Sequence, residues 1–122
     1  MKILLSMSLA LALTSCAKLT DVYTAVSSSS VPPKAIYVAI NSFDVAKASA
    51  VNYVNYCSPN PSPAGCDDAV IRTKLFPAMT RGTNARTQLR VFLHAHPGEF
   101  GPQGTYQAIV GSTDIISAIV GK

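Results

Sequence analysis

The chain has 122 residues, of which 48% are hydrophobic and 13% are charged. Ten Lys and Arg residues against six Asp and Glu give a formal net charge of +4 at pH 7. That mild excess suits the neighbourhood of an anionic surface. It excludes a typical nucleic-acid binder, which carries a dense basic stripe interleaved with aromatic side chains. The length is sufficient for one small domain with a modest core.

The first residues predict export from the cytoplasm. Lys2 is followed by an apolar run of about eleven residues, from residue 3 to residue 13. This run is too short to span a bilayer as a helix, but it has the length of the hydrophobic region of a secretory signal. We therefore expect residues 1–15 to be a cleaved signal peptide.

The apolar run ends in Leu13-Thr14-Ser15-Cys16. This motif resembles the lipobox of bacterial lipoprotein precursors, in which an aliphatic residue and two small residues precede the acylated cysteine. The resemblance implies that Cys16 becomes the N-terminus, carries fatty acyl chains such as palmitate, and anchors the protein to a membrane. Several acyl chains on one residue would hold the protein stably in a membrane, because each buried methylene contributes about 0.8 kcal/mol. One acyl chain alone gives only marginal binding.

Two further expectations concern cleavage and sorting. In the lipoprotein family, a residue other than Asp after the cysteine implies the outer membrane of a Gram-negative host, so Ala17 implies an anchor there that faces the periplasm. Alternatively, Ser15-Cys16-Ala17 fits the small-x-small pattern of ordinary secretion, which would release a soluble protein beginning at Lys18.

Residues 16–33 are expected to form a flexible tether, because they include four consecutive serines at positions 27–30 and show no clear hydrophobic period. Pro32 and Pro33 end this tether. They favour an extended conformation at Val31, and they suit the first turn of a helix. The folded domain is expected to span residues 34–122.

Cys57 and Cys66 remain as a pair if Cys16 carries lipid. They flank eight turn-forming residues, and in an oxidising compartment we expect a disulfide that closes this loop. The alternative is half of a metal site, but the sequence contains no second cysteine pair.

Residues 34–56 have apolar side chains at helical spacing. The stripe consists of Ile36, Ile40, Phe43, Ala46, Ala50, Val54 and Cys57. Lys47 falls inside this stripe. Either its stem follows the apolar surface while its amine reaches water, or it pairs with a carboxylate such as Asp114.

A second helix is predicted over residues 67–94, with Asp67 and Asp68 at its start. Its apolar face consists of Ile71, Leu75, Ala78, Met79, Gly82, Leu89 and Leu93. Pro77 predicts a kink, and Gly82-Thr83 is a second weak point that would give two shorter helices. Pro97-Gly98 should end the segment.

A third helix is predicted over residues 105–120, after a Gly- and Pro-containing loop. One face consists of Tyr106, Ile109, Val110, Thr113, Ile116 and Val120. A small apolar patch on the opposite side, made of Ala108, Ile115 and Ile119, is a candidate oligomer or lipid contact. Three amphipathic helices joined by short loops favour the all-α class, as a small antiparallel three-helix bundle.

Two clusters of side chains are candidate binding sites. Arg86 and Arg90 are four residues apart and could hold one phosphate, as on an anionic lipid, or they could form a solvated flank of the helix. His94 and His96, with Glu99 nearby, could bind zinc or copper, as in a secreted metal-binding protein. Histidines near a helix C-terminus also interact with its carbonyl groups, and we expect no metal site here.

The sequence lacks a catalytic constellation. It contains no Gly-x-Ser-x-Gly motif, no Gly-rich phosphate loop and no carboxylate pair apart from Asp67-Asp68, so we expect neither an enzyme nor a cofactor. The leading interpretation is a binding or structural module, with the membrane and an envelope protein or anionic lipid as partners. The oligomeric state stays open.

Three phrases carry a second resemblance: VAINSFD at residues 38–44, AVNYVNYC at 50–57 and RGTNARTQL at 81–89. They look like parts of small uncharacterised helical proteins encoded in proteobacterial, tailed-phage and prophage genomes. That resemblance implies a helical domain and brings no catalytic residues. It gives an alternative function, a phage-encoded envelope accessory protein for lysis or superinfection exclusion.

Overall fold

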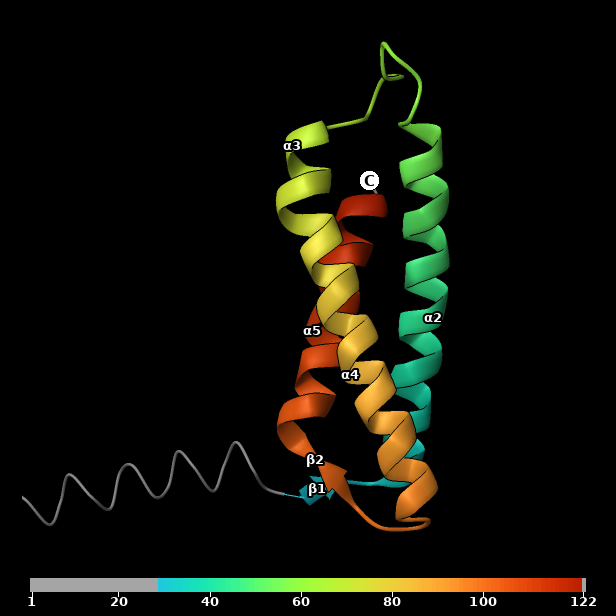
Figure 1. The fold of residues 1–122 in the computed structure, drawn as a ribbon, viewed down its shortest axis with the longest axis vertical. Helices are drawn as coiled ribbons and strands as arrows, with labels where there is room; N and C mark the ends of the chain where they lie inside the picture. Colours follow the sequence, from blue (N-terminus) through green and yellow to red (C-terminus); the bar gives the residue numbers. More distant parts are fainter. Residues whose placement is uncertain (1–28, 122) are drawn as a thin grey trace, which may run out of the picture.

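The computed structural model describes residues 29–121, so the predicted signal peptide, Cys16 and tether residues 17–28 lie outside the described residues. The described residues are mostly helical, at 76%, which agrees with the all-α prediction. Figure 1 shows the long helical segments side by side, with the loop after α2 at one end and a small strand pair at the other.

The first long helix, α2, spans Pro33–Tyr56. Pro32 is its N-cap and Pro33 its first residue, as the paired prolines predicted. The predicted stripe faces the interior: Ile36 and Phe43 are fully buried, and Val54 is partly buried against the core. Ala39 is also buried, so the face is wider than the predicted stripe.

The second segment consists of α3 (Asp68–Val70), the π-helical turn η1 (Ile71–Leu75) and α4 (Phe76–Ala95). Asp67 caps it as predicted, since its Oδ1 accepts a hydrogen bond from the Val70 amide at 3.2 Å. The π turn ends two residues before Pro77, and the Phe76 amide bonds to the carbonyl of Ile71. Pro77 has no amide donor, and a widened turn is one way to accommodate that loss.

The alternative of two shorter helices is wrong, because α4 continues through Gly82 and Thr83 without a break. Gly82 is buried where the ring of Phe43 approaches the backbone of α4, so its missing side chain allows close packing rather than a break. Gly98, with φ of +77°, follows the end of α4, as Pro97-Gly98 predicted.

The third long helix, α5, spans Gln103–Val120 and begins two residues earlier than predicted. Ile109 and Ile116 are fully buried, as expected, and so is Ser112. The predicted opposite patch is divided: Ile115 is exposed, whereas Ala108 and Ile119 pack against the core. α5 packs closely against both α2 and α4, while α2 and α4 meet each other less extensively.

A two-stranded pair was not predicted. β1 (Ser29–Val31) pairs antiparallel with β2 (Gly101–Pro102), which lies between α4 and α5. Val31 is extended, as predicted, but it belongs to the core and is only 3% exposed. The folded part of the chain therefore begins at least as early as Ser29, inside the segment assigned to the tether.

Candidate functional site

Arg86 and Arg90 of α4 both reach the carboxylate of Asp44 on α2. The Arg86 side chain donates from Nε to Oδ1 at 2.5 Å and from Nη2 to Oδ2 at 3.1 Å. Arg90 Nη2 lies 3.9 Å from Oδ2, which is too far for a hydrogen bond. The two arginines thus converge on one anion that belongs to the protein itself, and the binding of a phosphate by this pair stays a prediction.

The Asp44–Arg86 pair neutralises one of the two cations. The hydrogen bond with Asp44, supported by its negative charge, raises the pKa of Arg86 above its ordinary value, against a smaller opposing effect of burial. Both oxygens of Asp44 are engaged by the one guanidinium in a bidentate arrangement. Arg86 is therefore an internal partner of α2 rather than a free anion-binding group.

A cavity of about 350 Å³ opens beside this pair, between α2 and α4. Its polar lining comes equally from the two helices: Tyr37 and Asn41 from α2, and Arg90 and His94 from α4. In each pair the residues are four apart, which places them on the same side of their helix. This volume lies at the lower end of the range typical of small-molecule sites.

Apolar side chains complete the cavity. Ile40 and Leu93 line it from the core, with 2% and 8% of their surface exposed, and Pro97 lines it beyond the end of α4. Polar side chains thus make up more of the lining than apolar ones, and in ligand sites such groups fix the orientation of what is bound. We therefore take the cavity lined by Tyr37, Asn41, Arg90 and His94 as the candidate functional site.

Within residues 29–121, the side chains of Arg90 and His94 make no hydrogen bond. Asp44, Arg86 and Arg90 together carry one net positive charge. The side chain of Arg90 is 55% exposed, so its donors can be reached by a ligand. The cavity is thus positively charged on its α4 side.

The predicted histidine cluster is divided between two surroundings. His94 lines the cavity, whereas His96 Nδ1 lies 3.0 Å from Glu99 Oε2 and its ring stacks on Phe92. Among residues 29–121 no group of three or more His, Cys, Asp or Glu side chains could hold a metal ion. His96 and Glu99 are explained by their own pairing at the end of α4.

Lys47, the cation inside the apolar stripe of α2, bonds to a neutral partner. Its Nζ donates to Thr83 Oγ1 of α4 at 2.9 Å, and the residue is half-buried. The stem therefore follows the surface between the helices, while the amine reaches a hydroxyl rather than Asp114.

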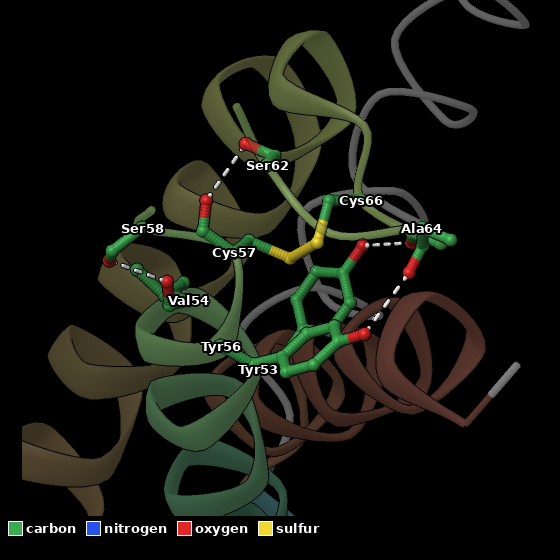
Figure 2. The surroundings of a disulfide bond; sticks show 9 residues. Tyr53, Val54, Tyr56, Cys57, Ser58, Ser62, Ala64 and Cys66 are labelled. Atoms are coloured by element: carbon green, nitrogen blue, oxygen red, sulfur yellow. Dashed lines mark hydrogen bonds between the residues drawn. A yellow bond between two sulfur atoms is a disulfide. The ribbon is translucent and has the colours of Figure 1, made fainter. Parts of the chain in front are cut away.

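Cys57 and Cys66 form the predicted disulfide, with their Cα atoms 5.7 Å apart. Figure 2 shows how the loop between them is held to α2. Tyr53 Oη donates to the carbonyl of Gly65 at 3.0 Å, and Tyr56 Oη donates to that of Ala64 at 3.3 Å. The loop is thus fixed by tyrosine hydroxyls as well as by the covalent link.

Ser62 adds a contact inside the same loop, since its hydroxyl donates to the carbonyl of Cys57 at 3.0 Å (Figure 2). Ser58 likewise donates to the carbonyl of Val54, in the last turn of α2. These bonds satisfy backbone carbonyls near the helix end that have no partner within the helix. The loop therefore has a structural role at the end of α2, and the sulfurs of Cys57 and Cys66 are bonded to each other.

The sequence did not identify Tyr37, Asn41 and Asp44 as site residues. Their spacing of four and then three residues places them on one flank of the α2 stripe. Arg86, Arg90 and His94 have the corresponding spacing on α4. The sequence therefore shows polar residues beside the apolar stripes of both helices. It does not show which of these flanks face each other, and the site can be predicted only when that is known.

Cys16, the predicted lipidation site, lies outside the described residues. Within those residues, no helix combines the length and the apolar character needed to cross a membrane. No protein-family model, curated protein or solved structure matches this chain.

Proposed function

We propose that this chain is a non-catalytic binding module held at a bacterial envelope by a lipid on Cys16. The observation that carries the binding role is the cavity between α2 and α4, where polar side chains from two helices surround an apolar floor. The anchor is supported by the resemblance of Leu13-Thr14-Ser15-Cys16 to a lipobox.

The binding domain is proposed to be a small antiparallel three-helix bundle. The packing of α5 against both α2 and α4 supports this arrangement. The short connections between consecutive helices support it as well. The disulfide loop joins α2 to the second segment, and β2 leads from α4 into α5. In bundles of this kind, ligand sites are built from side chains on facing helices.

The proposal of a binding role rather than catalysis rests on the composition of the cavity. Its lining residues include no Ser, Thr, Cys, Asp or Glu, so they offer neither an aliphatic hydroxyl or thiol nucleophile nor a carboxylate to orient His94. Arg, His, Asn and Tyr together are suited to hold a ligand by hydrogen bonds and charge.

The anchor is tested by expressing the full-length chain in a Gram-negative host and determining the mass of its mature N-terminus. We expect cleavage before Cys16, acyl chains on that residue, incorporation of labelled palmitate, and accumulation of the precursor when globomycin blocks the lipoprotein signal peptidase. Cys16→Ser should abolish labelling. An unmodified thiol at position 16, or an N-terminus at Lys18, would contradict the anchor and favour ordinary secretion.

Sorting has its own control. Because the lipoprotein family retains proteins with Asp after the cysteine in the inner membrane, Ala17→Asp should move the protein from the outer-membrane to the inner-membrane fraction. Unchanged fractionation of this variant, with labelling intact, would contradict outer-membrane sorting but not acylation.

A further inference from the structure

We infer that the cavity between α2 and α4 binds a small organic carboxylate, with Arg90 as the main partner of the charged group. This inference rests on the proposed binding function and names its ligand class. The apolar body of the ligand would lie against Ile40 and Leu93, which line the cavity from the core.

The sign of the ligand's charge follows from the side chains around the cavity. Asp44 is the acidic residue nearest to the site along α2, and both of its oxygens accept hydrogen bonds from Arg86. Arg90 remains as a cation with a guanidinium that can bind a carboxylate through two parallel hydrogen bonds. Asn41 and Tyr37, on the opposite wall, can add neutral donors.

The number of available cations favours a carboxylate over a phosphate group. A phosphate monoester carries about −1.5 to −2 charges at neutral pH and is best held by several cations or backbone amides. Here Arg86 is already paired, so Arg90 is the one guanidinium of the cavity that lacks a hydrogen-bonded partner within residues 29–121. A single carboxylate matches that single charge.

The apolar floor indicates what the rest of the ligand looks like. The cavity of about 350 Å³ is lined on its core side by aliphatic side chains and flanked by the ring of Tyr37. An aliphatic or aromatic body of modest size would cover the small part of these side chains that water still reaches. Ile40 and Leu93 are almost fully buried, so this apolar contact adds to the pairing with Arg90 and does not replace it.

The test uses three probes with a similar apolar body and different charge: phenylacetate, 2-phenylethanol and phenyl phosphate. Each is titrated calorimetrically into the purified full-length protein in detergent micelles, with empty micelles as the blank. We expect phenylacetate to bind at least tenfold more tightly than either of the other probes. Equal affinity for 2-phenylethanol, or tighter binding of phenyl phosphate, would overturn the assignment of a carboxylate.

Four variants locate the binding. Arg90→Gln removes the proposed partner of the carboxylate, and Asn41→Asp introduces a negative charge on the opposite wall of the cavity. Each substitution should lower the affinity for phenylacetate at least tenfold. Asn52→Asp places the same charge about three turns away on the same face of α2, and Arg81→Gln removes a cation from the other flank of α4. Both of these controls should stay within twofold of the parent.

Circular dichroism spectra of all four variants exclude unfolding as the cause of a loss, and the altered residues are exposed. Phenylacetate binding that survives both Arg90→Gln and Asn41→Asp would overturn the inference. Mass spectrometry of the same preparation separates the two proposals. A lipidated protein that binds no phenylacetate refutes the ligand class alone, and an unlipidated protein that binds it refutes the anchor alone.

Discussion

Gly82 of α4 lies against the aromatic ring of Phe43 of α2. A methyl group at position 82 would overlap the ring atoms Cε2, Cζ and Cδ2, and Phe43 is fully buried. The ring therefore has little room to move aside. This contact sets how closely α2 and α4 can approach, at a point between the candidate site and the disulfide loop.

Gly82→Ala is expected to lower the free energy of unfolding by about 1–3 kcal/mol, because overpacking in a close-packed core forces displacement of its neighbours. Gly111→Ala is the matched control, since a methyl group there meets nothing within 4 Å in the interior of α5. It should stabilise by up to about 1 kcal/mol through helix propensity. Urea unfolding measures the free energy of unfolding of both variants. Equal changes of the same sign for Gly82→Ala and Gly111→Ala would contradict the role of Phe43.

The Asp44–Arg86 pair should contribute a measurable coupling energy. A double-mutant cycle with Asp44→Asn and Arg86→Gln is expected to give about 0.5–1.5 kcal/mol, because the geometry is bidentate but the side chains are 37% and 30% exposed. Asp68–Arg72 is the control pair, at 75% and 69% exposure, and should give at most about 0.5 kcal/mol. A coupling for Asp44–Arg86 no larger than that of the control would contradict the prediction.

The pH dependence of this coupling follows from the raised pKa of Arg86. A raised pKa in the folded state means that the stabilisation is fully present at any pH below the pKa of Arg86 in the unfolded chain, and is lost only as the pH rises through the higher pKa of the folded state. The coupling energy should therefore be the same at pH 7 and at pH 10. A marked decrease at pH 10 would contradict the direction of the shift.

Loss of the Cys57–Cys66 disulfide should lower the melting temperature without abolishing helicity. A link across a sequence separation of 9 contributes about 2–3 kcal/mol by restricting the unfolded chain. The variant with both cysteines replaced by Ser should match the parent treated with reductant, and reductant should not affect it further. An unchanged melting curve of the parent under reductant would contradict a structural role for the link.

Lys47 is expected to depend on Thr83 and not on Asp114. Thr83→Val removes the acceptor of the Lys47 amine and should destabilise by about 1 kcal/mol. Asp114→Asn should leave the free energy of unfolding within about 0.5 kcal/mol of the parent, as is usual for an exposed side chain. A larger loss for Asp114→Asn than for Thr83→Val would restore the ion pair as the explanation.

Local patterns predicted the elements that depend on neighbours in sequence. The prolines at positions 32 and 33, the cap at Asp67, the end at Pro97-Gly98 and the link between Cys57 and Cys66 were all correct, because each follows from chemistry within a few residues. The main apolar stripes were also correct, since burial repeats with the helical period.

Long-range pairing explains what the sequence did not reveal. β1 and β2 are separated by about seventy residues and are two or three residues long, so neither carries a strand pattern. Ser112 was not expected in the core, yet its hydroxyl bonds to the carbonyl of Ala108 at 2.8 Å and is thereby satisfied. Asp44 and Arg86 meet only because two particular helix flanks face each other.

The pairing of β1 with β2 determines how a pulling force would enter the domain. Tension on the chain before Ser29 would load the hydrogen bonds between these strands and the contact from the Ser30 hydroxyl to Gln103, before it could reach the first turn of α2. The loop between α2 and α3, which the Cys57–Cys66 disulfide closes, lies at the opposite end of the bundle from β1 and β2 (Figure 1). Under such a force the domain would begin to unfold at the β1–β2 pair, while the disulfide would still join the end of α2 to the start of α3.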